Sequence, residues 1–130
     1  MKERILIVDD DKVTAKIAQL NLSQKGYEVF VVHAGMDAIS FLMKQEVDLI
    51  LMDIEMPIVN GMKTLELIRK RPELEKIPVI FLTASASSEL VIEANKLAAV
   101  DYVVKPYAPQ DLGERIRKAL YEKGKMKQNS

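Results

Sequence analysis

The strongest constraint on the fold of this chain is that five short apolar runs alternate with longer stretches in which apolar residues recur at helical spacing. Such runs are typical of strands buried on both faces, as in a parallel sheet. The predicted strands lie at residues 5–8, 27–32, 48–52, 78–82 and 102–104. The first predicted helix starts at Val13 and stops at Gly26, and the others lie at residues 36–43, 62–69, 88–97 and 110 to about 121.

Five strands, each followed by a helix, predict right-handed crossovers and therefore an α/β fold, a doubly wound five-stranded parallel sheet with helices on both faces. A chain of 130 residues has the size of one domain. We predict that this domain covers residues 1–123 and that 124–130 form a polar tail, with fraying from residue 123 onward. In the first helix Val13, Ile17 and Leu20 fall on one apolar stripe, and Asp11 is the expected N-cap.

The composition excludes several kinds of site. The chain has no cysteine and one histidine, which excludes disulfides, thiolate nucleophiles and cysteine-ligated zinc. Nineteen lysines and arginines balance nineteen aspartates and glutamates, so no overall field favours nucleic acid or an anionic membrane. The N-terminus lacks the apolar segment of a signal peptide, and no apolar run has the length of a membrane span, which predicts a cytoplasmic protein.

Polar residues follow four of the predicted strands, at the edge where ligands of such folds bind. Asp9 and Asp10 follow the first strand, Asp53 the third, Thr83 the fourth and Lys105 the fifth. Three carboxylates about 4 to 5 Å apart repel by roughly 3 to 4 kcal/mol per pair at an effective dielectric near 20. Lys105 can supply one positive charge, and magnesium, or else manganese, suits the remaining oxygen ligands. A carboxylate neutralised in this way can attack phosphorus and form an aspartyl phosphate.

Five short motifs, in this order and spacing, resemble those of the response-regulator receiver family of two-component signal transduction. They are Val8-Asp9-Asp10, Met52-Asp53-Ile54-Glu55-Met56-Pro57, Asn60-Gly61, Leu82-Thr83-Ala84 and Val104-Lys105-Pro106. The resemblance covers residues 4 to about 122. It implies the flavodoxin-like fold of CheY-like domains, with strand order 2-1-3-4-5.

Carried over residue by residue, the resemblance implies that Asp53 is the phospho-acceptor. It also implies that Asp9 and Asp10 hold Mg²⁺, or Mn²⁺, together with Asp53. The backbone carbonyl of Glu55 would complete the protein ligands, whereas the Glu55 side chain need not bind the metal.

The same resemblance assigns roles to three residues in or just after the last two predicted strands. Thr83 would hydrogen-bond a phosphoryl oxygen, Lys105 would pair with the phosphoryl charge, and the bond from Lys105 to Pro106 would be cis. Tyr102 matches the switch aromatic of the family, whose ring turns inward when Thr83 moves toward the phosphate. Phosphorylation adds about 1.5 to 2 negative charges, which suffices to shift a two-state equilibrium.

The resemblance also implies the partners of the protein. A sensor histidine kinase or a histidine phosphotransfer protein would donate the phosphoryl group. A downstream protein would bind the face formed by the fourth helix, the fifth strand and the fifth helix, with no direct contact to nucleic acid or membrane. The protein would be a signalling phospho-acceptor rather than an enzyme, catalysing only its own phosphorylation and dephosphorylation, and would be a monomer or a phosphorylation-dependent dimer.

Simpler interpretations stand beside these roles. The acidic residues after the first strand can serve only to cap a helix, and Asp11 is expected to do no more than that. Lys105 can be a solvated lysine and Thr83 a helix cap. Tyr102 can be a core residue with its hydroxyl at the surface.

Two other functions compete with phospho-acceptance. A pseudo-receiver would bind a partner without being phosphorylated, but such domains usually lose part of the pocket, and here all five positions are present. A magnesium-dependent phosphohydrolase with an aspartate nucleophile would carry a D-x-D signature. The segment Asp53-Ile54-Glu55 has glutamate in the second acidic position, and the chain is short for a substrate-covering cap.

Two positions depart from the family pattern. Asn60 stands where aspartate is frequent before a glycine, and Ala98 stands where glycine often follows the fourth helix. Because alanine at a positive φ costs stability, this helix is expected to run longer or to end differently.

The spacing within the fourth helix predicts which of its apolar residues face the core. Leu90, Ala94 and Leu97 form the inward stripe. Val91 and Ile92 fall off that stripe, which predicts an exposed apolar pair beside the fifth strand.

Overall fold

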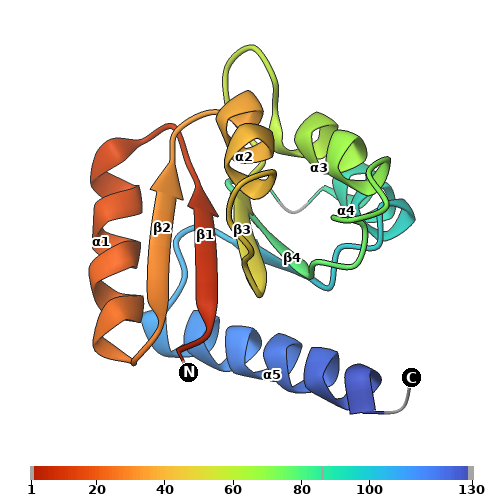
Figure 1. Cartoon of the computed structure of the whole chain (residues 1–130). Helices are drawn as coiled ribbons and strands as arrows, with labels where there is room; N and C mark the ends of the chain where they lie inside the picture. The colour runs from red at the N-terminus through yellow and green to blue at the C-terminus, as the bar shows by residue number, and fades with distance from the viewer. Residues whose placement is uncertain (1, 86, 129–130) are drawn as a thin grey trace.

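The chain folds into five parallel strands between two layers of helices, and the computed structural model describes residues 2–85 and 87–128. The strands are β1 (Arg4–Val8), β2 (Glu28–Val32), β3 (Leu49–Asp53), β4 (Val79–Thr83) and β5 (Asp101–Val104). The helices are α1 (Lys12–Gln24), α2 (Gly35–Leu42), α3 (Gly61–Arg69), α4 (Ser88–Lys96) and α5 (Pro109–Gln128). The strand order β2-β1-β3-β4-β5, all parallel, confirms the predicted doubly wound sheet (Figure 1).

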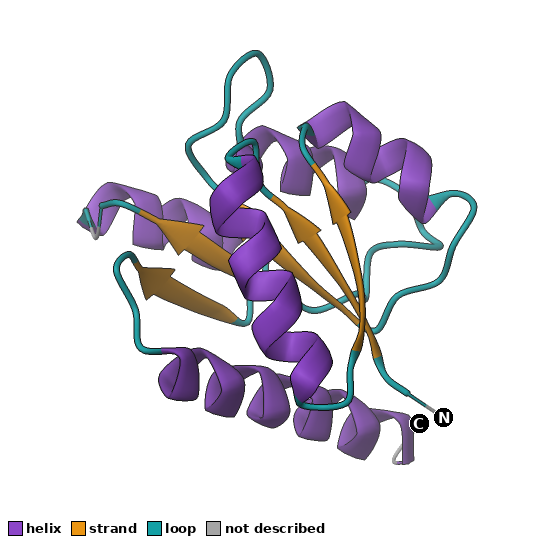
Figure 2. Cartoon of the chain, turned by 90° about the vertical axis from the view of Figure 1, so that its left-hand side faces the viewer, coloured by secondary structure: helices purple, strands orange, loops and turns teal. Residues whose placement is uncertain are grey.

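Alternate residues of each central strand face two separate cores. In β1, Leu6 and Val8 pack into the core beneath α2, α3 and α4, whereas Ile5 and Ile7 pack into the core beneath α1 and α5. Figure 2 shows helices on both faces of the sheet. Because both faces are covered, the strands read as continuous apolar runs, which is why they could be located in the sequence.

The buried face of α1 differs from the predicted one. Val13, Ile17 and Leu20 are 69%, 56% and 51% exposed, and the helix instead buries Ala15, Ala18 and Leu22. Both stripes have helical spacing, so periodicity alone does not choose between them. The helix begins just after the predicted N-cap, because the Asp11 carboxylate accepts hydrogen bonds from the Val13 and Thr14 amides at 3.0 and 3.1 Å. Ala15, Ala18 and Leu22 pack in the same core as Ile5 and Ile7 of β1.

The end of α4 corrects the expectation for Ala98. The helix ends at Lys96, and Ala98 adopts the left-handed conformation with φ of 58°. The Ala98 amide donates to the Asn95 carbonyl and the Ala99 amide to the Ala94 carbonyl, both at 3.0 Å. This is the Schellman pattern that usually has glycine at this position. The helix therefore ends in the turn that usually requires glycine, and the backbone of Ala98 is strained as a result.

Arg69, at the end of α3, supports this turn. Its guanidinium donates to the carbonyl oxygens of Leu97 at 2.9 Å and Ala98 at 3.3 Å, and to those of Glu75 at 2.9 Å and Ile77 at 2.8 Å. The bonds to Leu97 and Ala98 satisfy carbonyls just after α4, where the helix offers them no partner. The side chain joins α3, α4 and the segment before β4.

The exposed side of α4 agrees in part with the prediction. Ala94 is buried, and Leu90 and Leu97 pack at the edge of the core. Ile92 is 55% exposed, whereas Val91 is half-buried rather than exposed.

The last helix is longer than predicted. It continues to Gln128 rather than ending near residue 121, and residues 129–130 lie outside the described residues. Lys123 is held by Asp48, with its ammonium 3.5 Å from a carboxylate oxygen. The predicted domain boundary at residue 123 falls within this continuous helix. Within the described residues, no helix is long and apolar enough to span a membrane.

Candidate functional site

Three carboxylates meet at the carboxyl edge of the sheet. Asp9 and Asp10 follow β1, and Asp53 is the last residue of the neighbouring β3. Asp9 and Asp53 are buried, Asp10 is exposed, and one oxygen from each lies within 4.8 Å of the others. The convergence of these side chains was predicted from the sequence and is present in the fold.

Lys105, beyond the end of β5, supplies positive charge to this cluster. Its ammonium lies 3.4 Å from an Asp53 oxygen and 3.7 Å from an Asp9 oxygen. Burial works against charge on Lys105, but Asp53 and Asp9 outweigh it and hold the pKa of the ammonium above its usual value. The side chain is therefore a fixed cation of the pocket and not the freely solvated lysine of the simpler interpretation.

The surroundings of Asp53 change the acidity of its carboxyl. Burial raises the pKa of its carboxyl to about 6, Lys105 opposes this rise, and the neighbouring Asp9 adds to it. Among the described residues, its buried Oδ1 atom has no hydrogen-bond partner. A buried, unpartnered carboxylate oxygen is costly and is usually explained by a missing ion, water or reaction partner.

The donor set of this cluster fits a hard divalent cation. Mg²⁺ is bound through one or two carboxylates plus water and substrate oxygens, at about 2.0 to 2.1 Å. Oxygens that already lie within 4.8 Å of one another need only short side-chain movements to surround such an ion. The unpartnered Oδ1 of Asp53 provides a ready ligand. The described cluster could therefore hold a metal ion.

Thr83 is buried at the end of β4, and its hydroxyl has a partner that sequence reasoning missed. The hydroxyl donates to one carboxylate oxygen of Glu55 at 2.7 Å, and the Ala84 amide donates to the other oxygen at 2.7 Å. The sequence analysis considered only the backbone of Glu55. The contact joins residues 28 positions apart, and no local pattern in the sequence predicts it.

Tyr102 is linked to the same loop. Its half-buried ring packs against the core, and its hydroxyl donates to the Ser85 carbonyl at 2.6 Å. The Ser85 amide in turn donates to the Thr83 hydroxyl oxygen at 3.1 Å. Tyr102 is thus connected to Thr83 through one residue, although a switching role for it stays a prediction.

The backbone around the cluster is tightly packed. Gly61 lies against the Asp53 and Ile54 backbone, where a Cβ atom would overlap the Asp53 carbonyl, and its amide donates to Ile54 at 2.9 Å. Asn60 caps α3 by accepting a hydrogen bond from the Lys63 amide at 2.9 Å, as an aspartate would. The Lys105-Pro106 bond is cis, as predicted.

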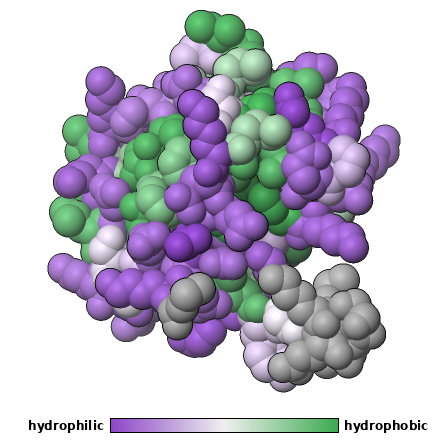
Figure 3. All heavy atoms as spheres, viewed as in Figure 1, coloured by the Kyte–Doolittle hydropathy of each residue, from purple (hydrophilic) through white to green (hydrophobic). Residues whose placement is uncertain are grey.

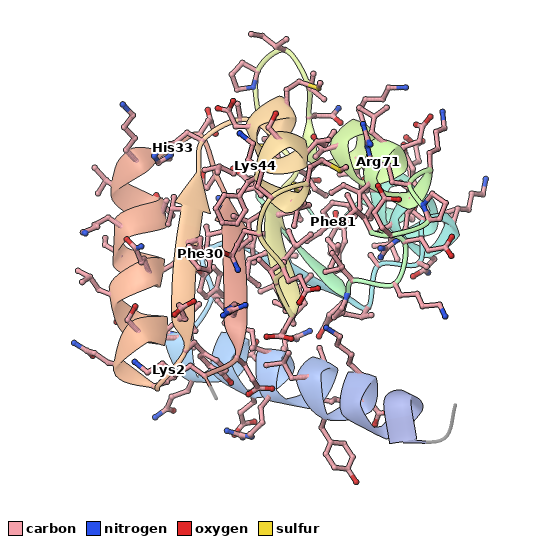
Figure 4. All side chains as sticks on the ribbon, viewed as in Figure 1. Lys2, Phe30, His33, Lys44, Arg71 and Phe81 are labelled. Carbon is pink, nitrogen blue, oxygen red and sulfur yellow. The ribbon has the colours of Figure 1, made fainter. Side chains whose placement is uncertain are left out.

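His33 is a second neighbour that the sequence analysis did not assign to the site. Its Nδ1 atom lies 3.0 Å from the Asp9 carbonyl oxygen. Figure 4 shows it just beyond the end of β2, at the same edge of the sheet as the acidic cluster. It buttresses the backbone that carries Asp9, and its position after a strand was the only available signal.

Comparison with solved structures finds close relatives of this fold. A response regulator receiver domain protein (CheY-like) from Methanospirillum hungatei is 32% identical, with a TM-score of 0.90 over 97% of this chain and 99% of the other. The chemotaxis protein CheY4 of Vibrio cholerae is 26% identical, with a TM-score of 0.88 over 92% and 99%. The signal receiver domain of a signal transduction histidine kinase from Syntrophus aciditrophicus is 30% identical, with a TM-score of 0.85 over 92% and 91%.

The fold and the acidic pocket at its carboxyl edge define a class of protein, the CheY-like domains of two-component signalling. The family model of the response regulator receiver domain matches residues 5–117, which is most of the chain. The chain belongs to the response regulator receiver domain family.

Proposed function

We propose that Asp53 accepts a phosphoryl group from a phosphohistidine of a sensor kinase or a histidine phosphotransfer protein. The observation that carries this proposal is the buried, unpartnered Oδ1 atom of Asp53, set beside the Lys105 ammonium and next to Asp9. A structural ion pair would engage both partners, whereas this pocket leaves a nucleophilic oxygen free among the described residues.

The chemistry of the step follows from these side chains. An Asp53 oxygen attacks phosphorus, a P–O bond forms and the P–N bond to the imidazole breaks. The imidazole nitrogen leaves with the bonding electron pair. The leaving imidazole is neutral when its other ring nitrogen already carries a proton, and otherwise it takes a proton from solvent. Lys105, 3.4 Å from Asp53, stabilises the charge on the transferring oxygens. Hydrolysis of the aspartyl phosphate by water completes the cycle, so no separate substrate is turned over.

The proposal includes a divalent cation in the acidic cluster. Asp9, Asp10 and Asp53, with the backbone carbonyl of Glu55, would hold Mg²⁺ or Mn²⁺. When bound, the cation would neutralise charge on the phosphoryl oxygens and the carboxylates. Asp9 is in addition fixed by the Asp11 amide, which donates to its Oδ1 atom at 2.9 Å.

The phosphodonor requires a docking surface near Asp53, and the exposed stripe of α1 supports one. Val13, Ile17 and Leu20 run along the helix that begins just after the Asp9-Asp10 pair. Hydrophobic side chains appear along the edge of the molecule where α1 lies, on the left in Figure 3. Ile58, fully exposed on the loop after Asp53, adds apolar surface at the same end of the sheet. An amphipathic helix carrying the phosphohistidine would suit this surface.

The proposed output surface is the face of α4, β5 and α5. Ile92 and Val104 are exposed on α4 and β5. Tyr102 ties β5 to the loop that follows Thr83, so a movement of Thr83 toward a phosphoryl group would act on this face. A downstream protein would bind there.

The test is intact-mass analysis after incubation with Mg²⁺ and phosphoramidate. We expect one phosphoryl adduct on the wild-type protein and on Asp37→Ala, which changes an exposed aspartate of α2, and none on Asp53→Ala. If the folded wild-type protein gains no adduct, the domain binds a partner without phosphorylation. If it instead releases phosphate from esters at a steady rate, it is a phosphohydrolase.

A further inference from the structure

The side chain of Glu55 bridges the Thr83 hydroxyl, which the proposed function assigns to a phosphoryl oxygen, and the amide of the next residue, Ala84. Its two carboxylate oxygens accept from the Thr83 hydroxyl and from the Ala84 amide, both at 2.7 Å. This length is typical of charge-assisted hydrogen bonds, which are stronger than neutral ones. The exposed Glu55 chain thus crosses from the loop after β3 to the end of β4.

Each of these donors can serve one acceptor at a time. A threonine hydroxyl has a single proton, and so does a backbone amide. The Thr83 hydroxyl therefore cannot donate to Glu55 and to a phosphoryl oxygen on Asp53 at once. Glu55 and the phosphoryl group are alternative acceptors for the Thr83 hydroxyl.

Electrostatic repulsion between the Glu55 carboxylate and a phosphoryl group on Asp53 also keeps the two from occupying this site together. A phosphoryl group on Asp53 carries about 1.5 to 2 negative charges, in a cluster that already contains Asp9 and Asp10. Glu55 lies two residues after Asp53, and hydrogen bonds hold its carboxylate at Thr83 and Ala84, at the end of the neighbouring β4. A carboxylate held there repels the incoming phosphoryl charge and must move out.

The contact with Glu55 also extends toward the proposed output face. The Thr83 hydroxyl oxygen accepts from the Ser85 amide at 3.1 Å, and the Ser85 carbonyl accepts from the Tyr102 hydroxyl at 2.6 Å. Glu55 therefore holds one end of a hydrogen-bonded chain whose other end is Tyr102. Removal of Glu55 from its donors frees Thr83 to move.

We propose that the Glu55 carboxylate is an internal competitor for the phosphoryl oxygens, which occupies the Thr83 and Ala84 donors before phosphorylation and must leave them afterwards. This inference rests on the proposed function, because it concerns the same site. It assigns Glu55 a role in setting how readily Asp53 is phosphorylated, separate from any role of its backbone carbonyl at a metal.

Titration with beryllium fluoride and Mg²⁺ tests the proposal, because trifluoroberyllate binds a carboxylate as a tetrahedral phosphoryl analogue. We expect Glu55→Ala to bind it about tenfold more tightly than the wild type, which corresponds to about 1.4 kcal/mol. Glu55→Gln, which keeps an acceptor but loses the charge, is expected to lie between them. Glu46→Ala removes an exposed glutamate at the opposite end of β3 and should bind like the wild type.

A second measurement tests the hydrogen bond from the Ala84 amide to Glu55 in the absence of a phosphoryl analogue. In ¹⁵N-edited NMR spectra of the unliganded protein, the Ala84 amide should shift and exchange with solvent faster in Glu55→Ala than in Glu46→Ala. An unchanged Ala84 amide, or equal or weaker trifluoroberyllate binding by Glu55→Ala, overturns the proposed competition while the phospho-acceptor function stands. Failure of all four folded proteins to bind trifluoroberyllate overturns the proposed function and this inference with it.

Discussion

Replacement of Asp53 by asparagine is expected to stabilise the metal-free protein at neutral and alkaline pH. The side chain is buried, and burial raises the pKa of its carboxyl to about 6 in spite of the nearby Lys105. Ionised Asp53 is thus less stable in the folded protein than in the unfolded chain. Asparagine has almost the same shape and no charge to bury, so it removes this penalty.

The magnitude follows from the two pKa values. The carboxyl changes from its usual 3.8 in the unfolded chain to about 6 in the folded protein. Between these values the folded protein binds more protons, so the contribution of Asp53 to stability falls as pH rises and is lost above the folded pKa. Relative to wild type, the asparagine variant should gain about 1 kcal/mol near pH 4.5 and about 3 kcal/mol near pH 8.

Urea unfolding followed by circular dichroism, with a chelator present, measures these differences. The chelator is needed because a bound cation would favour ionised Asp53 and reduce the gain. The matched control is Asp37→Asn, which changes an exposed aspartate of α2 and should leave the free energy of unfolding nearly constant. An Asp53→Asn variant that is no more stable than wild type, or that gains equally at both pH values, would refute the reasoning.

Three further substitutions test the packing that supports the site. Gly61→Ala should lower the free energy of unfolding by about 1 to 3 kcal/mol, because the new Cβ atom would overlap the Asp53 carbonyl. Arg69→Met should lower it by about 2 kcal/mol, because four carbonyl bonds, including that to Leu97, are lost. Ala98→Gly should raise it by about 1 kcal/mol, because φ of 58° is unstrained for glycine. Urea unfolding measures all three.

Each of these three predictions has a control or a result that would contradict it. Arg71→Met, at an exposed arginine nearby, should change stability much less than Arg69→Met. A Gly61→Ala protein as stable as wild type would show that the backbone after β3 can move to make room for the new Cβ atom without loss of stability. An Ala98→Gly protein that is less stable than wild type would contradict the strain assigned to the end of α4.

The strands and the acidic edge were predictable because each rests on a local signal. A strand covered on both faces is apolar throughout, and the residues that end parallel strands lie at one edge whatever the details of packing. β3, for example, lies at Leu49–Asp53, one residue from the predicted range. Asp9, Asp53 and Lys105 were therefore brought together in the prediction before any contact was known.

The errors arose where two patterns fit equally well or where a contact is long-range. The α1 sequence contains two stripes of helical spacing, and the prediction named the one with Val13, Ile17 and Leu20, which is exposed. The stripe that is buried contains the small residues Ala15 and Ala18. The bond from Glu55 to Thr83 joins residues 28 positions apart and has no local signal.

The most direct test of the central claim is to locate the phosphoryl group chemically. The protein is incubated with Mg²⁺ and phosphoramidate and then treated with borohydride, which reduces an aspartyl phosphate to homoserine, and its peptides are sequenced by mass spectrometry. The account predicts homoserine at Asp53 and at no other aspartate, and none without phosphoramidate. Homoserine at Asp9 or Asp10, or at no position in a protein shown to be folded, would contradict it.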